Sequence, residues 1–216
     1  MSLVKYRKKR NFSETSEPAG EARHKSGHRY VIQKHDAGHL HYDFRLELNG
    51  VLLSWAVPKG PTLDPGVKRL AVQTEDHPIE YSGFEGTIPE GAYGGGTVLL
   101  WDRGTWEPEG DAEQAYKKGH LKFQLHGEKL SGGWHLVRTQ RGNEKQKQWL
   151  LFKAQDEAAR AGDTSLLEKE HKSVSSGRDL AEIAGSKHAV WHPKKSAPAR
   201  KKAGTAPAGK KAGTAP

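Results

Sequence analysis

The sequence has 216 residues, enough for one domain of ordinary size with extensions. It contains no cysteine, which excludes disulfide bonds, thiolate zinc sites and cysteine nucleophiles and is typical of proteins from a reducing interior. Its formal net charge of +9 is concentrated at one end, since residues 186–216 hold eight basic residues and no acidic residue. No signal-peptide core follows the basic start and no apolar run approaches membrane-spanning length, so we expect a soluble intracellular protein without membrane association.

Residues 1–27 are polar and basic, and we expect them to form an N-terminal arm that contributes partly to a functional site. Residues 28–155 alternate over short segments that glycine and proline interrupt, the pattern of an antiparallel barrel or sandwich. The predicted strands cover residues 30–33, 40–48, 51–57, 69–75, 96–102, 119–125, 133–139 and 148–152. No long amphipathic helix separates them, so the predicted fold is mainly β.

The segment 40–48 carries polar residues of several chemical kinds on one side. Its apolar residues alternate with these and share the other side, as in a half-buried strand. The polar side carries His41, Asp43, Arg45 and Glu47. A strand that presents imidazole, carboxylate and guanidinium groups together can serve as the platform of a functional site.

Asn49-Gly50 follows this segment and is the strongest short signal for a two-residue type I′ turn. The next strand should therefore return antiparallel to the first. The register then places Phe44 opposite Trp55 on the apolar side. On the polar side Asp43 and Arg45 lie opposite small residues, which leaves open space above them.

His35, His41 and Asp43 supply two imidazoles and one carboxylate, a donor set that suits manganese, cobalt, zinc or iron(II) with coordination positions left for substrate. The alternative is that they are ordinary polar residues on a half-buried strand. Arg45 on the same side favours a phosphate beside the metal, because a planar guanidinium can bind phosphate through two hydrogen bonds. It could instead pair with Glu47 or Asp43.

A second alternating segment places Arg69, Glu75 and His77 on one side, and Tyr81 follows it. His77 could donate to a phosphate oxygen or act as general acid for a leaving alkoxide, since imidazole titrates near neutral pH. Alternatively, it is a structural residue that ends a strand before the following proline. Lys59 could add positive charge to the same opening or could be a solvated loop residue.

We expect residues 156–185 to form a helical extension, with short helices within AQDEAARAGDTSLLEKE and SGRDLAEIA. In residues 186–216 the sequence KKAGTAP occurs twice, and no residue there could build a core, so we expect a disordered basic tail. The charge of this tail should attract nucleic-acid phosphates in a salt-sensitive way, unless it is only a solubilising extension.

The run HDAGHLHYDFRLELNGVLLSWAVPKGP, followed by EDHPIEYSGFEGTIPEGAYGGGTVLLWDRGTW and WLLFK, resembles the phosphoesterase domain of the bacterial multifunctional DNA ligase D. The resemblance covers about residues 6–155, and SVSSGRDLAEIA resembles the linker that follows this domain in the large ligase. No nucleotidyl-transferase lysine motif is present, so the chain resembles a free-standing member of the family.

The resemblance implies a compact antiparallel β-barrel with short flanking helices. It also implies a manganese-dependent activity, with cobalt or zinc as alternative metals, that heals DNA 3′ ends in bacterial non-homologous end joining. A phosphodiesterase step would remove a terminal ribonucleoside, and a phosphomonoesterase step would then leave a 3′-hydroxyl. Implied partners are primer-template 3′ ends, including ribonucleotide-terminated ends, an end-binding protein and a separate ligase, in a cytoplasmic and nucleoid-associated location.

The same resemblance assigns roles to residues of this sequence. The metal ligands would be His35, His41 and Asp43. The catalytic residues around the scissile phosphate would be Arg45, His77 and Tyr81. Supporting or phosphate- and DNA-binding positions would be Glu17, Glu47, Lys59, Arg69 and Glu75.

The N-terminal KKRNFSETSEP resembles a family segment, but Asn11 stands where the family commonly has Asp. We expect this difference to weaken rather than abolish the step that uses the carboxylate. One alternative function is a catalytically weak or silent module that binds DNA or recruits a ligase. A second is an iron(II) oxygenase with two histidines and one carboxylate, although the usual order there is His-x-Asp with a distant histidine.

Overall fold

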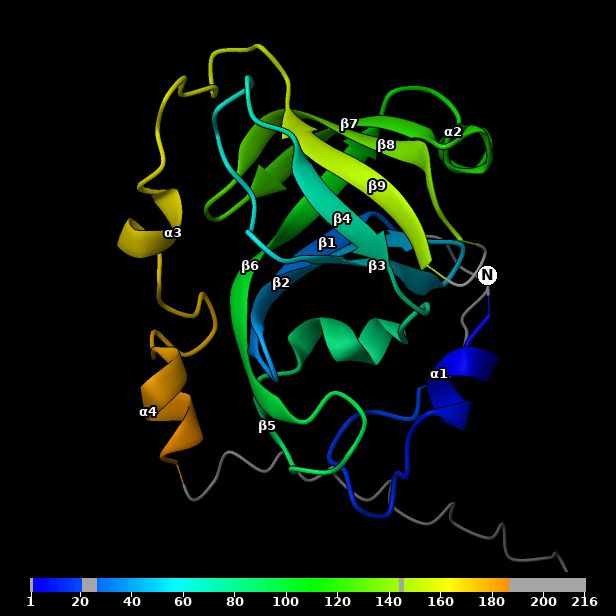
Figure 1. The fold of residues 1–216 in the computed structure, drawn as a ribbon, viewed down its shortest axis with the longest axis vertical. Coiled ribbons are helices and arrows are strands. Elements are labelled where there is room, and N and C mark those ends of the chain that lie inside the picture. The colour runs from blue at the N-terminus through cyan, green and yellow to red at the C-terminus, as the bar shows by residue number, and fades with distance from the viewer. Residues whose placement is uncertain (1, 21–26, 144–145, 187–216) are drawn as a thin grey trace, which may run out of the picture.

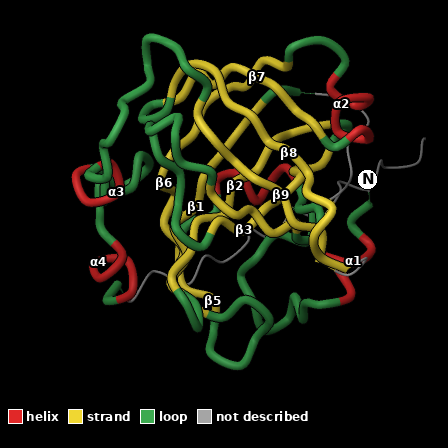
Figure 2. The backbone as a smooth tube through the Cα atoms, turned by 45° about the horizontal axis from the view of Figure 1, so that its top comes forward, coloured by secondary structure: helices red, strands yellow, loops and turns green. Residues whose placement is uncertain are grey.

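The first strand of the sheet pairs with two neighbours, and this double pairing closes a barrel. The computed structural model describes residues 2–20, 27–143 and 146–186. Within them, nine strands form one antiparallel sheet in the order β1-β2-β3-β4-β9-β8-β7-β6-β5, and β1 also pairs with β6. The barrel therefore closes through eight strands, with β5 attached to the edge of β6. Figure 2 shows the strands wrapped into this barrel. The predicted mainly β fold and antiparallel barrel are confirmed.

The predicted strands all overlap strands of the structure (Figure 1). The strands are β1 (Arg29–Asp36), β2 (Leu40–Leu48), β3 (Val51–Val57), β4 (Arg69–Gln73), β5 (Gly86–Ile88), β6 (Gly96–Pro108), β7 (His120–Gly127), β8 (Ser131–Asn143) and β9 (Gln146–Lys153). The helical elements are α1 (Val4–Lys8), the 3-10 helix η1 (Ile79–Gly83), α2 (Ala112–Lys118), α3 (Leu166–Lys169) and α4 (Leu180–Ala184). The sequence did not predict β5, because three residues are too few to reveal an alternation.

The β2–β3 hairpin has the predicted register. Phe44 pairs with Trp55, and Asp43 pairs with Ala56. The turn residues Asn49-Gly50 have φ values of 50° and 78°, and a type I′ turn requires positive φ at both positions. The turn therefore fixes which side of β2 faces the barrel interior and which side stays available for polar chemistry.

Large aromatic side chains fill the barrel interior and hold the apolar side of β2. The Phe44 ring lies 6.3 Å from the Trp55 ring and 6.0 Å from the Phe123 ring, centre to centre. Trp55 meets Trp149 edge to face at 5.7 Å. Burying each of these rings contributes roughly 1.5–3 kcal/mol, so the orientation of β2 is strongly determined.

A second layer covers the polar side of β2 and consists of α1, η1 and β5, which lie below the barrel in Figure 1. An apolar cluster joins these elements to β3 and β6, and it comprises Tyr6, Leu52, Ile79, Tyr81, Phe84, Ile88 and Val98. The helices α1 and η1 have five residues each, too few to produce a recognisable helical periodicity in the sequence. Tertiary packing rather than intrinsic helix propensity therefore places them.

The C-terminal extension packs against the barrel and shares its core, since Leu166 and Ile183 belong to the main apolar cluster. The helix predicted within residues 154–170 is confined to α3. Asp156 and Asp163 hydrogen-bond to backbone N–H groups two residues ahead, and such local turns compete with helix formation. The helix α4 forms where the sequence predicts it and begins with a capping box.

Two predictions concern segments that lie wholly or partly outside the described residues. The predicted basic tail begins at residue 186, and residues 187–216 are not described. The predicted N-terminal arm includes residues 21–26, which are not described either. Among the residues that the structure covers, no helix has the length and apolar character needed to cross a membrane.

Gly96 begins β6 at the point where this strand meets β1. Its φ is 142°, and a Cβ atom there would lie 2.2 Å from the Asp36 carbonyl oxygen. We expect Gly96→Ala to lower the free energy of unfolding by about 2–4 kcal/mol, because both the backbone strain and the backbone clash must be relieved. Urea unfolding followed by tryptophan fluorescence measures the change. Gly38→Ala is the matched control, since nothing lies within 4 Å of a Cβ atom there, and equal losses in both variants would contradict the argument.

Candidate metal and phosphate site

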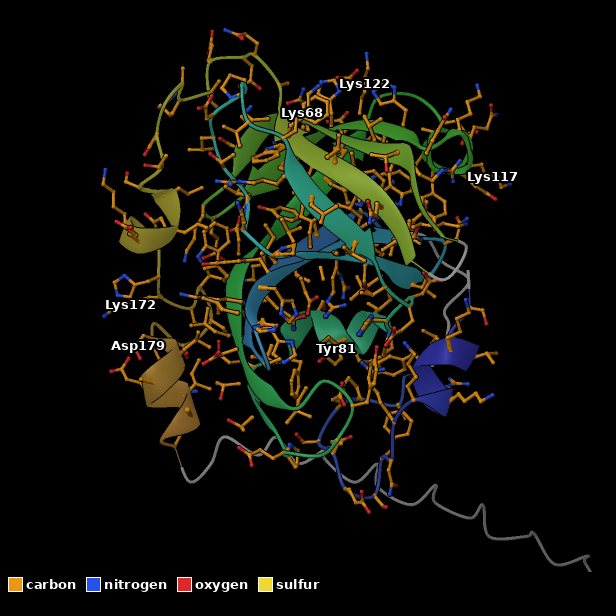
Figure 3. The ribbon with its side chains drawn as sticks, in the orientation of Figure 1. Lys68, Tyr81, Lys117, Lys122, Lys172 and Asp179 are labelled. Carbon is orange, nitrogen blue, oxygen red and sulfur yellow. The ribbon has the colours of Figure 1, made fainter. Side chains whose placement is uncertain are left out.

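The polar side of β2 opens into a pocket of about 200 Å³ between the barrel and the layer of α1, η1 and β5. Figure 3 labels one of its residues, Tyr81, on the η1 helix below the barrel strands. The pocket brings together eight of the predicted site residues, namely Glu17, His35, His41, Asp43, Arg45, Glu75, His77 and Tyr81. These residues come from four separate parts of the chain, so only the folded protein assembles them.

Three candidate metal ligands converge at one side of this pocket. The ligand atoms of His35, His41 and Asp43 all lie within 4.8 Å of one another. His35 Nδ1 is 3.7 Å from one Asp43 carboxylate oxygen, and His41 Nε2 is 3.8 Å from the other. The pairing of β1 with β2 explains this convergence, because His35 lies directly opposite His41 and Asp43 follows on the same side of β2.

The hydrogen bonds of the two histidines fit a bound divalent cation. His41 Nδ1 lies 2.9 Å from the His39 carbonyl oxygen, which can only accept, so Nδ1 carries the proton and Nε2 presents a lone pair to the site. His35 Nε2 is buried and has no hydrogen-bond partner among the described residues. His35 Nδ1 is the nitrogen that faces the Asp43 carboxylate, 3.7 Å away, and could bind a cation held there. Two imidazole nitrogens and one carboxylate are a donor set that manganese, cobalt and zinc accept.

Arg45 is 2% exposed, and three hydrogen bonds fix its guanidinium plane. Its Nε donates to Gln33 at 2.8 Å, and its terminal nitrogens donate to Ser54 at 2.8 Å and to Asp43 at 2.9 Å. Gln33 in turn donates to the Tyr81 carbonyl oxygen at 3.1 Å, which ties β1 to η1. The pairing with Asp43 that the sequence left open is therefore present. The remaining guanidinium N–H groups are available to an anion in the pocket.

Asp43 remains ionised in this environment. Burial opposes its negative charge, but the Arg45 guanidinium and the two neighbouring imidazoles hold the pKa of Asp43 well below its usual range. A carboxylate must be deprotonated before it can bind a cation. Asp43 can therefore serve as a charged oxygen ligand for a cation, and it is the anion that pairs with Arg45.

Arg10 joins the N-terminal segment to the pocket, and it was not among the predicted site residues. It donates to Glu17 at 2.8 Å and to Glu75 at 3.0 Å. Its other terminal nitrogen lies 3.2 Å from His77 Nε2, and its guanidinium carbon lies 3.9 Å from the centre of the Tyr6 ring. Because Arg10 stands in a run of basic residues, only its burial in the folded protein distinguishes it from its exposed neighbours.

His77 is neutral in the pocket. Burial first, and then the positive charges of Arg45 and Arg10, lower its pKa well below the ordinary value. Its Nδ1 lies 2.9 Å from the Glu75 carbonyl oxygen and therefore carries the proton, while Nε2 accepts from Arg10. The sequence suggested that His77 could act as a general acid. In this arrangement Nε2 must first take a proton before it can give one.

Tyr81 keeps its phenolic proton, because burial and the negative charge of Glu17 raise its pKa well above the ordinary value. Its ring lies 4.9 Å from the Arg45 guanidinium carbon and 4.9 Å from the His77 ring. A protonated phenol beside these two groups can donate a hydrogen bond to an anion in the pocket.

Three predicted supporting residues lie outside the pocket. Glu47 stands at the other end of β2, where it accepts a hydrogen bond from the backbone of Arg29 at 3.3 Å. Lys59 and Arg69 line a separate hollow with Lys68, which Figure 3 labels at the far end of the barrel from η1. Their supporting or nucleic-acid-binding roles remain predictions.

The position at which β4 ends explains why Arg69 lies outside the pocket while His77 lies in it. The strand stops at Gln73, so the alternation that the sequence predicted does not continue from Arg69 to His77. His77 is instead held by an isolated bridge to Leu52 of β3, with backbone hydrogen bonds of 2.8 and 2.9 Å. This short pairing turns His77 into the pocket.

Asn11 is exposed and does not line the pocket. Its side-chain oxygen accepts hydrogen bonds from the backbone nitrogen and the hydroxyl of Ser13, at 3.3 and 2.7 Å. In this structure Asn11 therefore stabilises the turn that follows α1. The expected weakening of one catalytic step by this residue remains a prediction.

Glu75 should make the stability of the folded protein sensitive to acid. Burial opposes its charge, but hydrogen bonds from Lys9 and Arg10, both at 3.0 Å, lower its pKa below the ordinary value of 4.5. Because the pKa is lower in the folded state, the charged carboxylate contributes stability above pH 4.5, and this contribution is lost as the pH falls through the folded-state pKa.

We expect Glu75→Gln to lower the free energy of unfolding by about 1–3 kcal/mol at pH 7 and by progressively less below pH 4.5. Urea unfolding across this pH range measures the difference from wild type. Glu90→Gln removes an exposed carboxylate from a nearby loop and serves as the control. A Glu75→Gln difference that is independent of pH would contradict the assignment.

Comparison with known proteins gives one family. Residues 33–138 match the family described as the DNA ligase D 3′-phosphoesterase domain. Over 183 residues the chain is 57% identical to the multifunctional non-homologous end joining protein LigD of Pseudomonas aeruginosa, and the alignment covers 82% of this chain and 22% of that protein.

Two mycobacterial relatives agree with this result. The chain is 47% identical over 139 residues to the multifunctional non-homologous end joining DNA repair protein LigD of Mycobacterium tuberculosis, covering 63% of this chain and 18% of that protein. It is 43% identical over 163 residues to the LigD protein of Mycolicibacterium smegmatis, covering 72% and 21% respectively. The chain thus spans about a fifth of the length of the curated relatives it matches.

Proposed function

The chain belongs, through residues 33–138, to the family of DNA ligase D 3′-phosphoesterase domains, and we propose that it is a metal-dependent hydrolase that heals the 3′ ends of DNA. A phosphodiesterase step removes a terminal ribonucleoside and leaves a 3′-phosphate. A phosphomonoesterase step then removes that phosphate and leaves a 3′-hydroxyl for ligation. One observation supports this proposal above all. The cluster of His35, His41 and Asp43 lies in the same pocket as the fixed guanidinium of Arg45.

The protein's own groups suit phosphate ester hydrolysis. Arg45 binds the phosphoryl oxygens and, because its plane is already fixed, stabilises the charge that grows on them in the transition state. Tyr81 donates a hydrogen bond to the same anion. His77 is neutral, and its Nε2 lone pair, which accepts from Arg10, is the group that accepts a proton during hydrolysis.

The metal in this proposal is manganese, with cobalt and zinc as alternatives. His35, His41 and Asp43 hold it, and the convergence of their ligand atoms within 4.8 Å and the lone pair of His41 Nε2 support this assignment. A divalent metal bound there supplies Lewis-acid polarisation of the phosphoryl group and a more acidic bound water. Asp43 and Arg45 remain paired at 2.9 Å, so the cation site and the phosphate-binding guanidinium lie side by side.

A 3′-end assay tests the proposal. Primer-templates ending in a ribonucleotide, a 3′-phosphate or a plain 3′-hydroxyl are incubated with manganese, cobalt, zinc or EDTA and resolved by electrophoresis. We expect the first two to be converted to shorter or dephosphorylated products with manganese and to remain unchanged in EDTA. A silent DNA-binding module would shift the mobility of the native complexes but leave all three ends intact with every metal.

The names of the relatives support a place in non-homologous end joining repair. We propose primer-template 3′ ends as substrates, with an end-binding protein and a separate ligase as partners, in the cytoplasm at the nucleoid. The chain spans about a fifth of those relatives, and the role we propose for it is the end-processing step.

A further inference from the structure

Tyr93 is the exposed residue of the pocket lining. It lies in the loop between β5 and β6, and 47% of its surface remains accessible to solvent. Single exposed apolar residues are ordinary on protein surfaces. Tyr93 differs from these because specific contacts hold its ring at the mouth of the pocket.

Lys9 of the N-terminal segment fixes the Tyr93 ring. Its ammonium group donates to the Tyr93 hydroxyl at 2.8 Å and lies 4.5 Å from the ring centre. The same ammonium group pairs with Glu75 at 3.0 Å, and Arg10 lies 5.3 Å from the ring. In Figure 1 the loop between β5 and β6 lies beside the N-terminal segment. Positively charged groups therefore hold the ring while nearly half of its surface stays open.

Gly94 keeps the space between Tyr93 and the metal-ligand cluster open. Its φ is 79°, and the nearest atom to a Cβ placed there is His35 Cε1 at 3.9 Å. Because glycine has no side chain, nothing from this position covers His35. The ring of Tyr93 and the cluster thus open onto the same cavity.

The size of the cavity determines what can lie against the ring. Pockets that enclose a drug-sized ligand have volumes of roughly 300–1,000 Å³, whereas this pocket has about 200 Å³. It can hold a phosphate and part of a sugar but not a whole nucleotide. The base of a nucleotide whose phosphate reaches Arg45 must therefore remain at the mouth, where the exposed aromatic surface is Tyr93.

We propose that Tyr93 is the stacking platform for a nucleobase of the strand whose 3′ end enters the pocket, and that Lys9 holds the platform in position. This inference rests on the proposed function. It adds a specificity determinant, since aromatic stacking recognises any nucleobase while a small phosphate ester without a base gains nothing from it. The protein therefore prefers nucleic-acid ends to small phosphomonoesters.

Fluorescence anisotropy tests the platform. The probe is a 5′-fluorescein oligonucleotide with a 3′-phosphate, in EDTA so that no turnover occurs. We expect Tyr93→Leu to raise Kd by about 5- to 150-fold, the range for loss of one stacked base. Tyr93→Phe keeps the ring and should bind close to wild type. The slope of log Kd against log salt should not change in either variant, because neither removes a charge. Leu70→Ala, at an exposed apolar residue outside the pocket, is the matched control.

A turnover measurement separates this inference from the proposed function. With manganese, the ratio of kcat/KM for the 3′-phosphorylated oligonucleotide to that for glycerol 2-phosphate should fall in Tyr93→Leu by a factor similar to the rise in Kd. Three outcomes would each overturn the proposed platform. The first is unchanged affinity for the probe in Tyr93→Leu, and the second is an equal loss of affinity in Tyr93→Phe and Tyr93→Leu. The third is a wild-type protein that does not bind the probe. If wild type binds the probe but hydrolyses no 3′ end with any metal, the proposed function fails while the anisotropy result still decides the role of Tyr93.

Discussion

Asp43→Asn should reduce both esterase steps by at least about 1,000-fold and abolish manganese binding. Asparagine keeps the shape of the side chain but removes the negative charge that a divalent cation requires beside His35 and His41. It also leaves Arg45 buried without the carboxylate that now lies 2.9 Å away. Release of 3′-phosphate from a primer-template measures the first effect, and isothermal titration with manganese measures the second.

The matched control for this variant is Asp36→Asn, which neutralises an exposed carboxylate at the end of β1 in the same hairpin. It should retain both turnover and manganese binding. Because an uncompensated buried charge costs about 3–5 kcal/mol, circular dichroism must first establish that Asp43→Asn is folded at the assay temperature. Undiminished 3′-phosphatase turnover in folded Asp43→Asn would reject the metal cluster.

Arg45→Lys should lower turnover by about 100- to 1,000-fold and leave manganese binding intact. A lysine ammonium can still pair with Asp43, so the charge beside the cluster is preserved. If the lysine ammonium replaced the three hydrogen bonds of Arg45 to Gln33, Ser54 and Asp43, it would have no donor left for a phosphate. It also cannot present a planar pair of donors to a phosphate. Steady-state phosphate release and manganese titration on the same preparation separate the two effects.

Arg103→Lys provides the comparison for the Arg45 variant. Arg103 is an exposed arginine on β6 whose Nε pairs with Glu128 at 2.7 Å. Exposed ion pairs contribute little, so this substitution should leave turnover and stability nearly unchanged. A normal rate in Arg45→Lys, or loss of manganese binding there, would contradict the phosphate role.

The β2–β3 hairpin could be predicted in detail from the sequence, because each of its determinants is local. The alternation of residues 40–48 separates a core side from a polar side, and Asn49-Gly50 fixes the turn. Register then follows from counting along two strands. The same local logic placed His41, Asp43 and Arg45 on one side, and their shared position in the pocket agrees with it.

The pocket beyond this hairpin could not be derived in the same way. Arg10 and Tyr93 contribute to it from segments whose sequences contain no periodic signal, and long-range contacts such as that between Lys9 and Tyr93 bring these segments together. The alternation of residues 69–77 predicted that Arg69 and His77 lie on the same side of one strand. The strand ends between them, so the structure separates these residues.

The sequence by itself determined the fold class and the polar side of β2, since alternation and turn residues act over a few neighbouring positions. Only the tertiary structure showed that Arg10 and Tyr93 join the pocket and which ionisation states the pocket residues adopt. The physical reason is that burial and charge pairing depend on what packs nearby. His77 is neutral because it is buried and because Arg45 and Arg10 are close in space, both of which lower its pKa. Asp43 is ionised because Arg45 and two imidazoles surround it and lower its pKa despite burial.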